Sequence, residues 1–198
     1  MLDSYSLTDC PHCTKDLTSL SPTGEQQILC NLKNEGGLQQ GLDILPILTE
    51  ETYLKAYPEE RRCQAFLEFC GAGDVEAVVD LLKHEDDEQD RLEKTDILRY
   101  QDNIRTMNSG LHVAVQNKKP DIVWLLLLLA SNLDPSAFPQ DVIEVATNFG
   151  LQRQPLDGKI DIRSLRDSSG QTAEERAVLV GDVWEDWVIS GRLKDPTR

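Results

Sequence analysis

Hydrophobic and polar residues follow one another along this chain with the spacing of short helices joined by tight turns. The longest apolar run covers residues 122–130 and contains no polar side chain. A helix that is apolar all round must be covered on more than one side. Residues 108–117 predict a shorter helix before it, and Pro120 with Asp121 suits the first turn of the second helix. The stretch therefore predicts a helical hairpin that needs neighbouring helices.

Parts of this pattern recur on both sides of the hairpin. Residues 64–82 lie upstream, and residues 142–150 and 167–183 lie downstream, each with apolar stretches next to a turn. One turn position can be aligned in all four units, and its successive steps are 45, 32 and 31 residues for Gly73, Lys118, Gly150 and Gly181. The spacing predicts repeated helical pairs, with an insertion after the first.

The central hairpin resembles an ankyrin repeat. Residues 109–114 read Ser-Gly-Leu-His-Val-Ala, against the family pattern Thr-Pro-Leu-His-x-Ala, although Lys118 replaces the usual glycine. Residues 167–172 match the family's Asp-x-x-Gly-x-Thr opening, and the family period is about 33 residues. The resemblance implies an all-α fold: an ankyrin-like helical-hairpin solenoid of about four repeats in residues 59–195, with a helical or irregular N-terminal capping arm in residues 1–58.

Within the arm, residues 25–32 place apolar side chains on one helical face, and Thr49 suits the start of another helix. The arm most simply caps the first repeat, because the terminal units of a solenoid need their apolar faces covered. The alternative is an arm that binds a partner.

The arm also contains Cys10 and Cys13 in the sequence Cys-Pro-His-Cys. One interpretation is a zinc knuckle, with Cys30 as a further ligand. A second is a thioredoxin-like redox pair, which needs a preceding buried strand that residues 4–9 do not predict. A third is a turn with free thiols. No other cofactor is predicted.

Charge restricts the class of partner. The formal net charge is −15 and the pI is about 4.5. Nucleic acid is not expected as a direct partner, because phosphate binding needs a basic surface. Acidity favours a basic protein segment through electrostatic steering, although solubility alone also explains it. The acidic insertion at about 85–96 predicts a solvated segment or a docking site for a Lys/Arg-rich client, and it lacks the spacing of a calcium loop.

Location and oligomeric state follow from simpler signals. The chain shows no secretory signal at its start and no apolar run of about 20 residues, so no membrane association is expected. Five cysteines, an odd number, are typical of reduced thiols in the cytoplasm and/or the nucleus. We expect the chain alone to be a monomer.

The resemblance also implies the positions that contact a partner, since ankyrin proteins use turn tips and the ends of first helices. In this sequence they are Arg105, Thr106, Asn108, Gln116, Asn117, Phe138, Gln140, Asn148, Phe149, Ser168, Ser169 and Gln171. Trp184 and Trp187 lie three residues apart, on one helical face, and form either core or a binding hot spot. The family equivalent of His112 hydrogen-bonds the neighbouring repeat, so a structural role is implied for it.

The function expected from these features is non-enzymatic protein binding, as a chaperone or escort of a basic protein segment. The alternative is an adaptor or assembly factor that bridges two proteins, with a possible zinc-binding arm. No paired carboxylates, metal-ligand spacing or phosphate-binding loop indicates catalysis.

Overall fold

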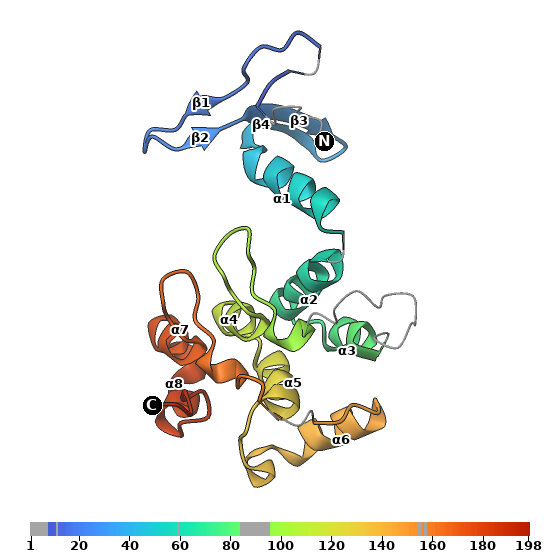
Figure 1. The fold of residues 1–198 in the computed structure, drawn as a ribbon, viewed down its shortest axis with the longest axis vertical. Coiled ribbons are helices and arrows are strands. Elements are labelled where there is room, and N and C mark those ends of the chain that lie inside the picture. Colours follow the sequence, from blue (N-terminus) through green and yellow to red (C-terminus); the bar gives the residue numbers. More distant parts are fainter. Residues whose placement is uncertain (1–7, 11, 59, 84–95, 154–155, 157) are drawn as a thin grey trace. The chain divides into compact units, whose positions relative to one another are not determined.

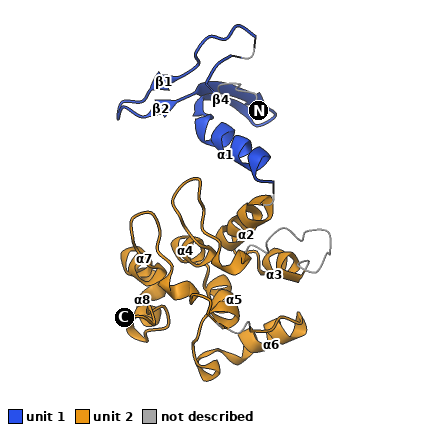
Figure 2. Cartoon of the chain, in the orientation of Figure 1, with its two compact units in different colours: residues 1–59 blue, residues 60–198 orange. Residues whose placement is uncertain are grey.

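The computed structural model divides the chain into two compact units, residues 1–59 and residues 60–198 (Figure 2). Each unit is described by itself below. The described residues are 8–10, 12–58, 60–83, 96–153, 156 and 158–198. The acidic insertion predicted at about 85–96 therefore lies outside them, except for Asp96.

In its described residues, the first unit has two small antiparallel β-hairpins followed by one helix (Figure 1). Strand β1 pairs with β2 and strand β3 pairs with β4, with an irregular register between Cys30 and Leu32. The elements are β1 (Ser19–Leu20), β2 (Gln26–Gln27), β3 (Leu29–Asn34), β4 (Gly37–Asp43) and α1 (Leu45–Ala56).

Glycine and one aspartate shape this unit. Gly37 has φ +121° at the reversal between β3 and β4, a conformation that side chains rarely allow. The Asp43 carboxylate accepts hydrogen bonds from the backbone N–H groups of Ile28 (2.9 Å) and Leu45 (3.1 Å), and so joins the second hairpin to the start of α1. Ile28 and Leu54 are buried, whereas most strand side chains are exposed.

The second unit is built from short helices (Figure 1). The α-helices are α2 (Glu60–Ala72), α3 (Val75–Lys83), α4 (Gly110–Gln116), α5 (Pro120–Ala130), α6 (Gln140–Asn148), α7 (Ala173–Val180) and α8 (Glu185–Ile189). The described residues between them include the 3₁₀ turns η2 (Ile97–Arg99), η3 (Pro135–Ala137), η4 (Ile162–Ser164) and η5 (Asp182–Trp184).

The helical hairpin predicted for residues 108–130 is confirmed as α4 and α5. Lys118 takes φ +55° in its turn, in the place where the upstream pair α2–α3 has Gly73 at φ +81°. Gly110 lets α4 approach α2 closely, because a Cβ atom there would lie 2.7 Å from the Phe66 ring. Helix α4 consequently packs between α2 and α7.

The prediction of an all-α, ankyrin-like solenoid of about four repeats is wrong. Helix α6, the expected opening of the third repeat, packs against α5, and α4 contacts α7 directly, so the helix contacts do not repeat in a simple series. Residues 151–161 contain no second α-helix after α6 in their described part. The apolar character of α5 explains this arrangement. A helix that is apolar all round has to be covered on several sides, and α6 covers a side of α5 that the next repeat would cover in a regular solenoid.

The prediction of a helical or irregular arm is also incorrect for residues 19–43, which form the two β-hairpins. Leu29 and Leu32 are three residues apart, which imitates a helical face in the sequence, yet both are exposed on β3. The Glu35–Gly36 turn reverses the chain within two residues, so that Asn34 at the end of β3 pairs with Gly37 at the start of β4.

Within the described segments, no helix has the length and apolar character needed to cross a membrane. The most apolar one, α5, has 11 residues.

Candidate binding surface

The first part of the candidate site is the loop at residues 101–109, which leads into α4. Gln101 and Ser109 form an isolated antiparallel bridge, and Asp102 exchanges backbone hydrogen bonds with Met107 (2.9 Å) and Asn108 (3.0 Å). The buried Asp102 carboxylate also accepts the backbone N–H of Ile104 at 3.0 Å. The loop is thus a closed hairpin with an exposed tip.

The second part is the loop at residues 166–171, which leads into α7. The Asp167 carboxylate accepts the backbone N–H groups of Ser169 (2.8 Å) and Gln171 (3.0 Å), and the Arg176 guanidinium lies 2.6 Å away. Burial alone would raise the pKa of Asp167, but these hydrogen bonds and the arginine hold it below its ordinary value. Thr172 and Glu175 then form a capping box that starts α7.

Hydrogen bonds lock the two loops side by side. The Ser168 N–H donates to the Thr106 carbonyl at 2.9 Å. The Gln101 side-chain amide donates to the carbonyls of Met107 and Arg166, both at 2.7 Å. We call the exposed tips of residues 103–107 and 168–170 the two-loop surface.

The buried side chain of His112 connects the ends of the two loops. Its Nδ1 atom lies 2.8 Å from the Ser109 hydroxyl, and its Nε2 atom lies 3.0 Å from the Gln171 carbonyl oxygen. The ring is buried, and burial lowers the pKa of His112, so the ring is neutral near pH 7. His112 therefore links α4 to the second loop.

We predict that His112→Ala lowers the free energy of unfolding by about 2 kcal/mol, because the Ser109 hydroxyl and the Gln171 carbonyl each lose one hydrogen bond and a buried ring leaves a cavity. Urea denaturation of the two chains measures this difference. The control is Gln116→Ala, an exposed position on the same helix, which should change stability by less than about 0.5 kcal/mol. Equal stability of His112→Ala and the parent would contradict the role given to the ring.

The structure gathers part of the predicted contact set on the two-loop surface. The predicted residues on this surface are Arg105, Thr106, Ser168 and Ser169, all exposed, and the half-buried Asn108 and Gln171 lie directly beside it in the chain. Two other predicted residues, Gln116 and Asn117, are exposed at the opposite end of α4. The remaining set belongs to α6 and its flanks, where the exposed residues are Gln140 and Asn148, Phe149 is half-buried and Phe138 is buried.

Sequence reasoning did not select Gln101 and Asp102, which hold the first loop in place. Asp102 could have been selected from the local sequence, because an aspartate whose carboxylate accepts the backbone N–H two residues later is typical of a turn. Gln101 had none, because its partner at Arg166 comes from a distant part of the chain.

The two predicted tryptophans lie in the core, not on a binding surface. Trp184 is fully buried and its indole N–H donates to the Val115 carbonyl at 2.9 Å. Trp187 is 8% exposed and lies against Trp124, with ring centroids 4.3 Å apart and ring planes tilted by 44°. Phe138 packs edge-on to Trp124. Of the two alternatives for the tryptophan pair, the structure thus supports the core.

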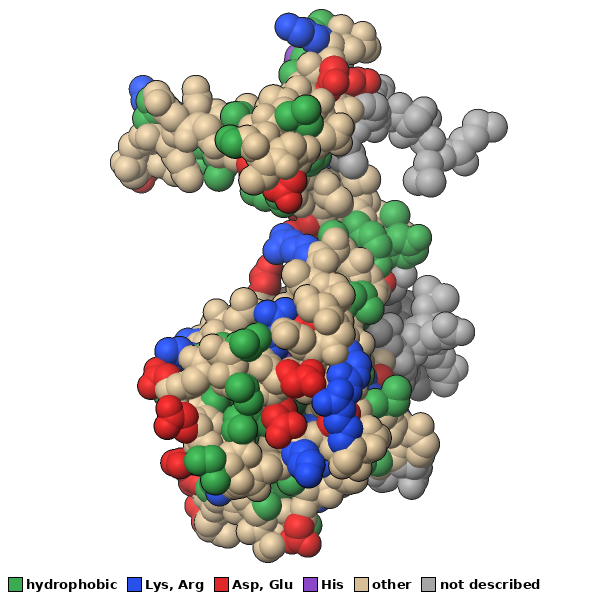
Figure 3. Space-filling model, turned by 90° about the vertical axis from the view of Figure 1, so that its left-hand side faces the viewer, with side chains coloured by type: hydrophobic (Ala, Val, Ile, Leu, Met, Phe, Trp, Pro, Cys, Tyr) green, Lys and Arg blue, Asp and Glu red, His purple; other side chains and the backbone are tan. Residues whose placement is uncertain are grey.

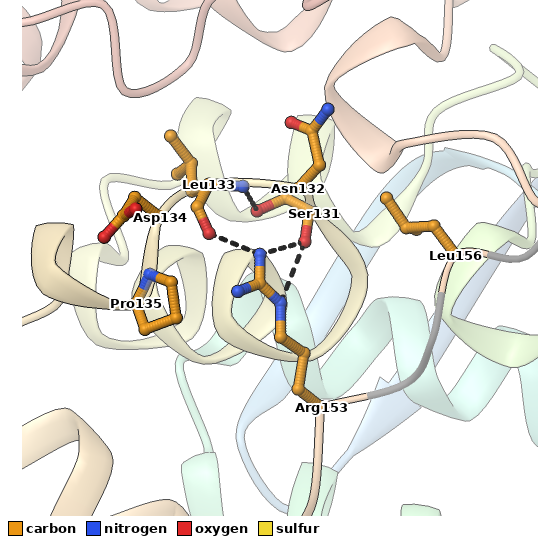
Figure 4. Close-up of a pocket in the computed structure, with 7 residues that line it drawn as sticks. All are labelled: Ser131, Asn132, Leu133, Asp134, Pro135, Arg153 and Leu156. Atoms are coloured by element: carbon orange, nitrogen blue, oxygen red, sulfur yellow. Dashed lines mark hydrogen bonds between the residues drawn. The ribbon is translucent and has the colours of Figure 1, made fainter.

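A cavity of about 440 Å³ lies between the segment 131–135 and residues 153 and 156 (Figure 4). The Arg153 guanidinium donates to the carbonyl oxygens of Ser131 and Leu133. Arg153 thus holds the loop after α5, and Figure 4 shows its hydrogen bonds going to backbone oxygens. The lining offers no pair of titratable side chains placed for proton transfer among the residues drawn there.

The five cysteines fall into two environments. Cys63 and Cys70 lie in the core on α2, and burial raises the pKa of Cys70 strongly. Cys10 is half-buried and Cys13 exposed in a turn, and Cys30 is half-buried on β3. The described residues include no group of three His, Cys, Asp or Glu side chains that could hold a metal ion, so Cys30 does not join the pair.

Several carboxylates of the second unit form hydrogen bonds and ion pairs with other residues of the same unit. Asp195 accepts the Ser164 and Thr197 hydroxyls, each at 2.7 Å, and lies 3.2 Å from the Arg166 guanidinium. Glu175 pairs with Arg198 at 2.8 Å. Figure 3 shows acidic and basic side chains interspersed on one face of this unit, so the negative charge does not form a single separate area there.

This arrangement predicts a loss of stability in acid. Burial raises the pKa of Asp195, but the hydrogen bonds from Ser164 and Thr197, with Arg166 nearby, lower it to about 2. An unfolded aspartate titrates near 3.9, so the stabilisation is complete above that pH and is lost as the pH falls toward 2. We expect Asp195 to contribute about 2 kcal/mol to this loss. Urea denaturation at pH 5 and at pH 2.5 measures it, and Asp195→Asn should show a smaller pH dependence.

Comparisons of the chain with protein-family models, with curated proteins and with solved structures found no match.

Proposed function

We propose that residues 60–198 form a non-enzymatic protein-binding module and that the two-loop surface makes its main contact. The observation that carries the proposal is the hydrogen-bonded pairing of the two loops through Ser168, Thr106 and Gln101. Exposed tips that are already ordered lose little conformational entropy when a partner binds. The tips offer hydroxyl, amide and guanidinium groups, which suit a polar contact.

The proposed partner is a basic protein segment, which this protein escorts or protects as a chaperone. The net charge of −15 supports this choice, since it attracts a basic chain over a distance of about a Debye length. The two-loop surface itself carries Arg105, so charge is expected to speed association more than to form the contact.

The non-enzymatic assignment is supported by the use of His112 in the structure, where both ring nitrogens have protein partners. The resemblance to ankyrin repeats is proposed only for the local sequence 109–114 and the loop before it, since the helices do not form a repeating solenoid. We also propose a location in the cytoplasm or the nucleus, because all five cysteines are free thiols.

A second candidate function is an adaptor that bridges two proteins. The division of the chain into two compact units favours it, because residues 1–59 could bind one protein and residues 60–198 another. An adaptor and an escort can be told apart by the proteins that are purified together with this chain.

The test is an affinity purification of the tagged full chain from extract of its own cells, at low and at moderate salt, with bound proteins identified by mass spectrometry. An escort recovers one basic protein near one-to-one, and the recovery falls as salt is added. An adaptor recovers several proteins in a complex that survives the added salt. Recovery of no basic protein would contradict the escort.

Two matched variants locate the contact. Ser169→Arg adds bulk and charge on the two-loop surface, and Asn148→Arg makes the same change on exposed α6. We expect Ser169→Arg to weaken binding of the recovered partner at least about tenfold, since an interface core rejects an unpaired charge, and Asn148→Arg to bind as the parent does. The opposite pattern would move the contact to α6 and contradict the two-loop proposal.

A further inference from the structure

Cys10 and Cys13 lie at the tip of a small turn in the first unit. Asp9 and Asp16 form an antiparallel bridge below the tip, and the Cys10 N–H donates to the Lys15 carbonyl at 2.8 Å. The Thr14 N–H donates a hydrogen bond to the Cys10 carbonyl, also at 2.8 Å. These bonds close the chain around the two cysteines, so that both sulfur atoms come from one short turn.

The turn leaves both cysteines within reach of solvent, since Cys13 is exposed and Cys10 is half-buried. Thr14 takes φ +54°, a conformation that is rare for a β-branched residue, and so completes the turn immediately after Cys13. Thiolates rather than thiols are the ligands of soft metal ions.

We propose that Cys10 and Cys13 form half of a four-thiolate site, and that two copies of this chain share one tetrahedral zinc-type ion through it. A structural zinc ion takes four ligands, and one turn supplies two of them. The same turn of a second copy supplies an identical pair, in a two-fold contact that closes on itself. Cys13 is exposed and Cys10 is only half-buried, so a second turn can reach both.

Cys30 is not needed for this site. It is half-buried on β3, and the described residues do not place it in a group of three ligands with Cys10 and Cys13. Cys63 and Cys70 are buried on α2 and cannot compete for the ion. Binding transfers the thiol protons to the solvent, and no electron transfer is involved. The chain is then a monomer without the metal and a dimer with it, and this does not rest on the proposed protein-binding function.

The experiment uses the reduced full chain, freed of metal and titrated with Co²⁺, whose absorption reports tetrahedral thiolate ligation. We expect strong absorption that saturates at one Co²⁺ for every two chains, with light scattering after gel filtration showing a shift from monomer to dimer. Added Zn²⁺ should remove the colour and keep the dimer, since thiolates prefer zinc to cobalt. A chelator should restore the monomer.

Two variants decide between a shared site and a site within one chain. Cys13→Ser should abolish both the cobalt absorption and the dimer, and Cys30→Ser should leave both unchanged. Circular dichroism of each variant, compared with the parent, shows that the fold is intact. Saturation at one Co²⁺ per monomeric chain, or loss of the absorption in Cys30→Ser, would overturn the shared site, as would a reduced parent that binds no cobalt.

Discussion

Replacing Asp161 with alanine is expected to lower the free energy of unfolding by about 3–5 kcal/mol, because it leaves the guanidinium of Arg163 buried without its counter-charge. The two side chains are 6% and 5% exposed, and they lie 2.8 Å apart. Asp161 also accepts the backbone N–H groups of Asn132 (2.7 Å) and Arg163 (2.9 Å). Burial raises the pKa of Asp161, but these bonds and Arg163 hold it below its ordinary value, so the carboxylate is charged near pH 7.

The measurement is urea denaturation of Asp161→Ala and of the parent, with two comparisons. Asp134→Ala removes an exposed aspartate that only caps η3, and should cost about 1 kcal/mol. Replacing both Asp161 and Arg163 with leucine should cost less than Asp161→Ala alone, because no uncompensated charge then remains in the core. A double variant that is no more stable than the single one would show that the buried charge is not the cause.

The pair has a clear structural task. Arg163 also donates to the side chain of Asn132, so both charges hold the segment after α5 against η4. Residues 131–135 then lead to α6. Loss of the pair should therefore loosen the attachment of α6 while α4 and its loop stay in place, which hydrogen exchange of the two helices can measure.

The sequence predicted the helices of the second unit better than their packing. The apolar run in α5 and the local pattern around His112 are properties of neighbouring residues, and both appear in the structure as expected. Helix α6 was predicted as a helix, but its partner depends on which side of α5 needs covering, and that is decided by contacts far apart in the chain.

The hairpins of the first unit were missed because their side chains give no alternating pattern. Strand β3 is exposed along most of its length, so its hydrophobic residues are not ordered by a buried face. The candidate surface was predicted in part: the tips at Arg105 and Ser168 follow from turn positions, whereas the pairing of the two loops depends on Gln101 and a distant carbonyl. Burial of Trp184 and Phe138 was not fixed by spacing alone.

Trp184→Ala is the second replacement with a large expected effect, about 3–5 kcal/mol of unfolding free energy. Trp184 is the largest fully buried side chain of the described residues. Its ring meets Trp187 edge-on, with centroids 5.3 Å apart, and Trp187 lies at a tilt against Trp124 of α5. Removing the indole therefore leaves a cavity beside Trp187, and it also removes one of the donors to the Val115 carbonyl of α4, which keeps the Lys118 N–H at 3.2 Å.

Trp184→Phe separates these two contributions, because it keeps an aromatic ring and removes the N–H. We expect it to cost about 1–3 kcal/mol, from the loss of one buried hydrogen bond and of the packing around a smaller ring, while the Val115 carbonyl keeps the Lys118 N–H. Ile189→Ala on α8 is the control, since Ile189 is 84% exposed and should change stability by less than about 0.5 kcal/mol. Urea denaturation followed by circular dichroism measures all three. If Trp184→Ala were as stable as Ile189→Ala, the ring would have to be accessible in solution, and the binding hot spot would be the better interpretation of the tryptophan pair.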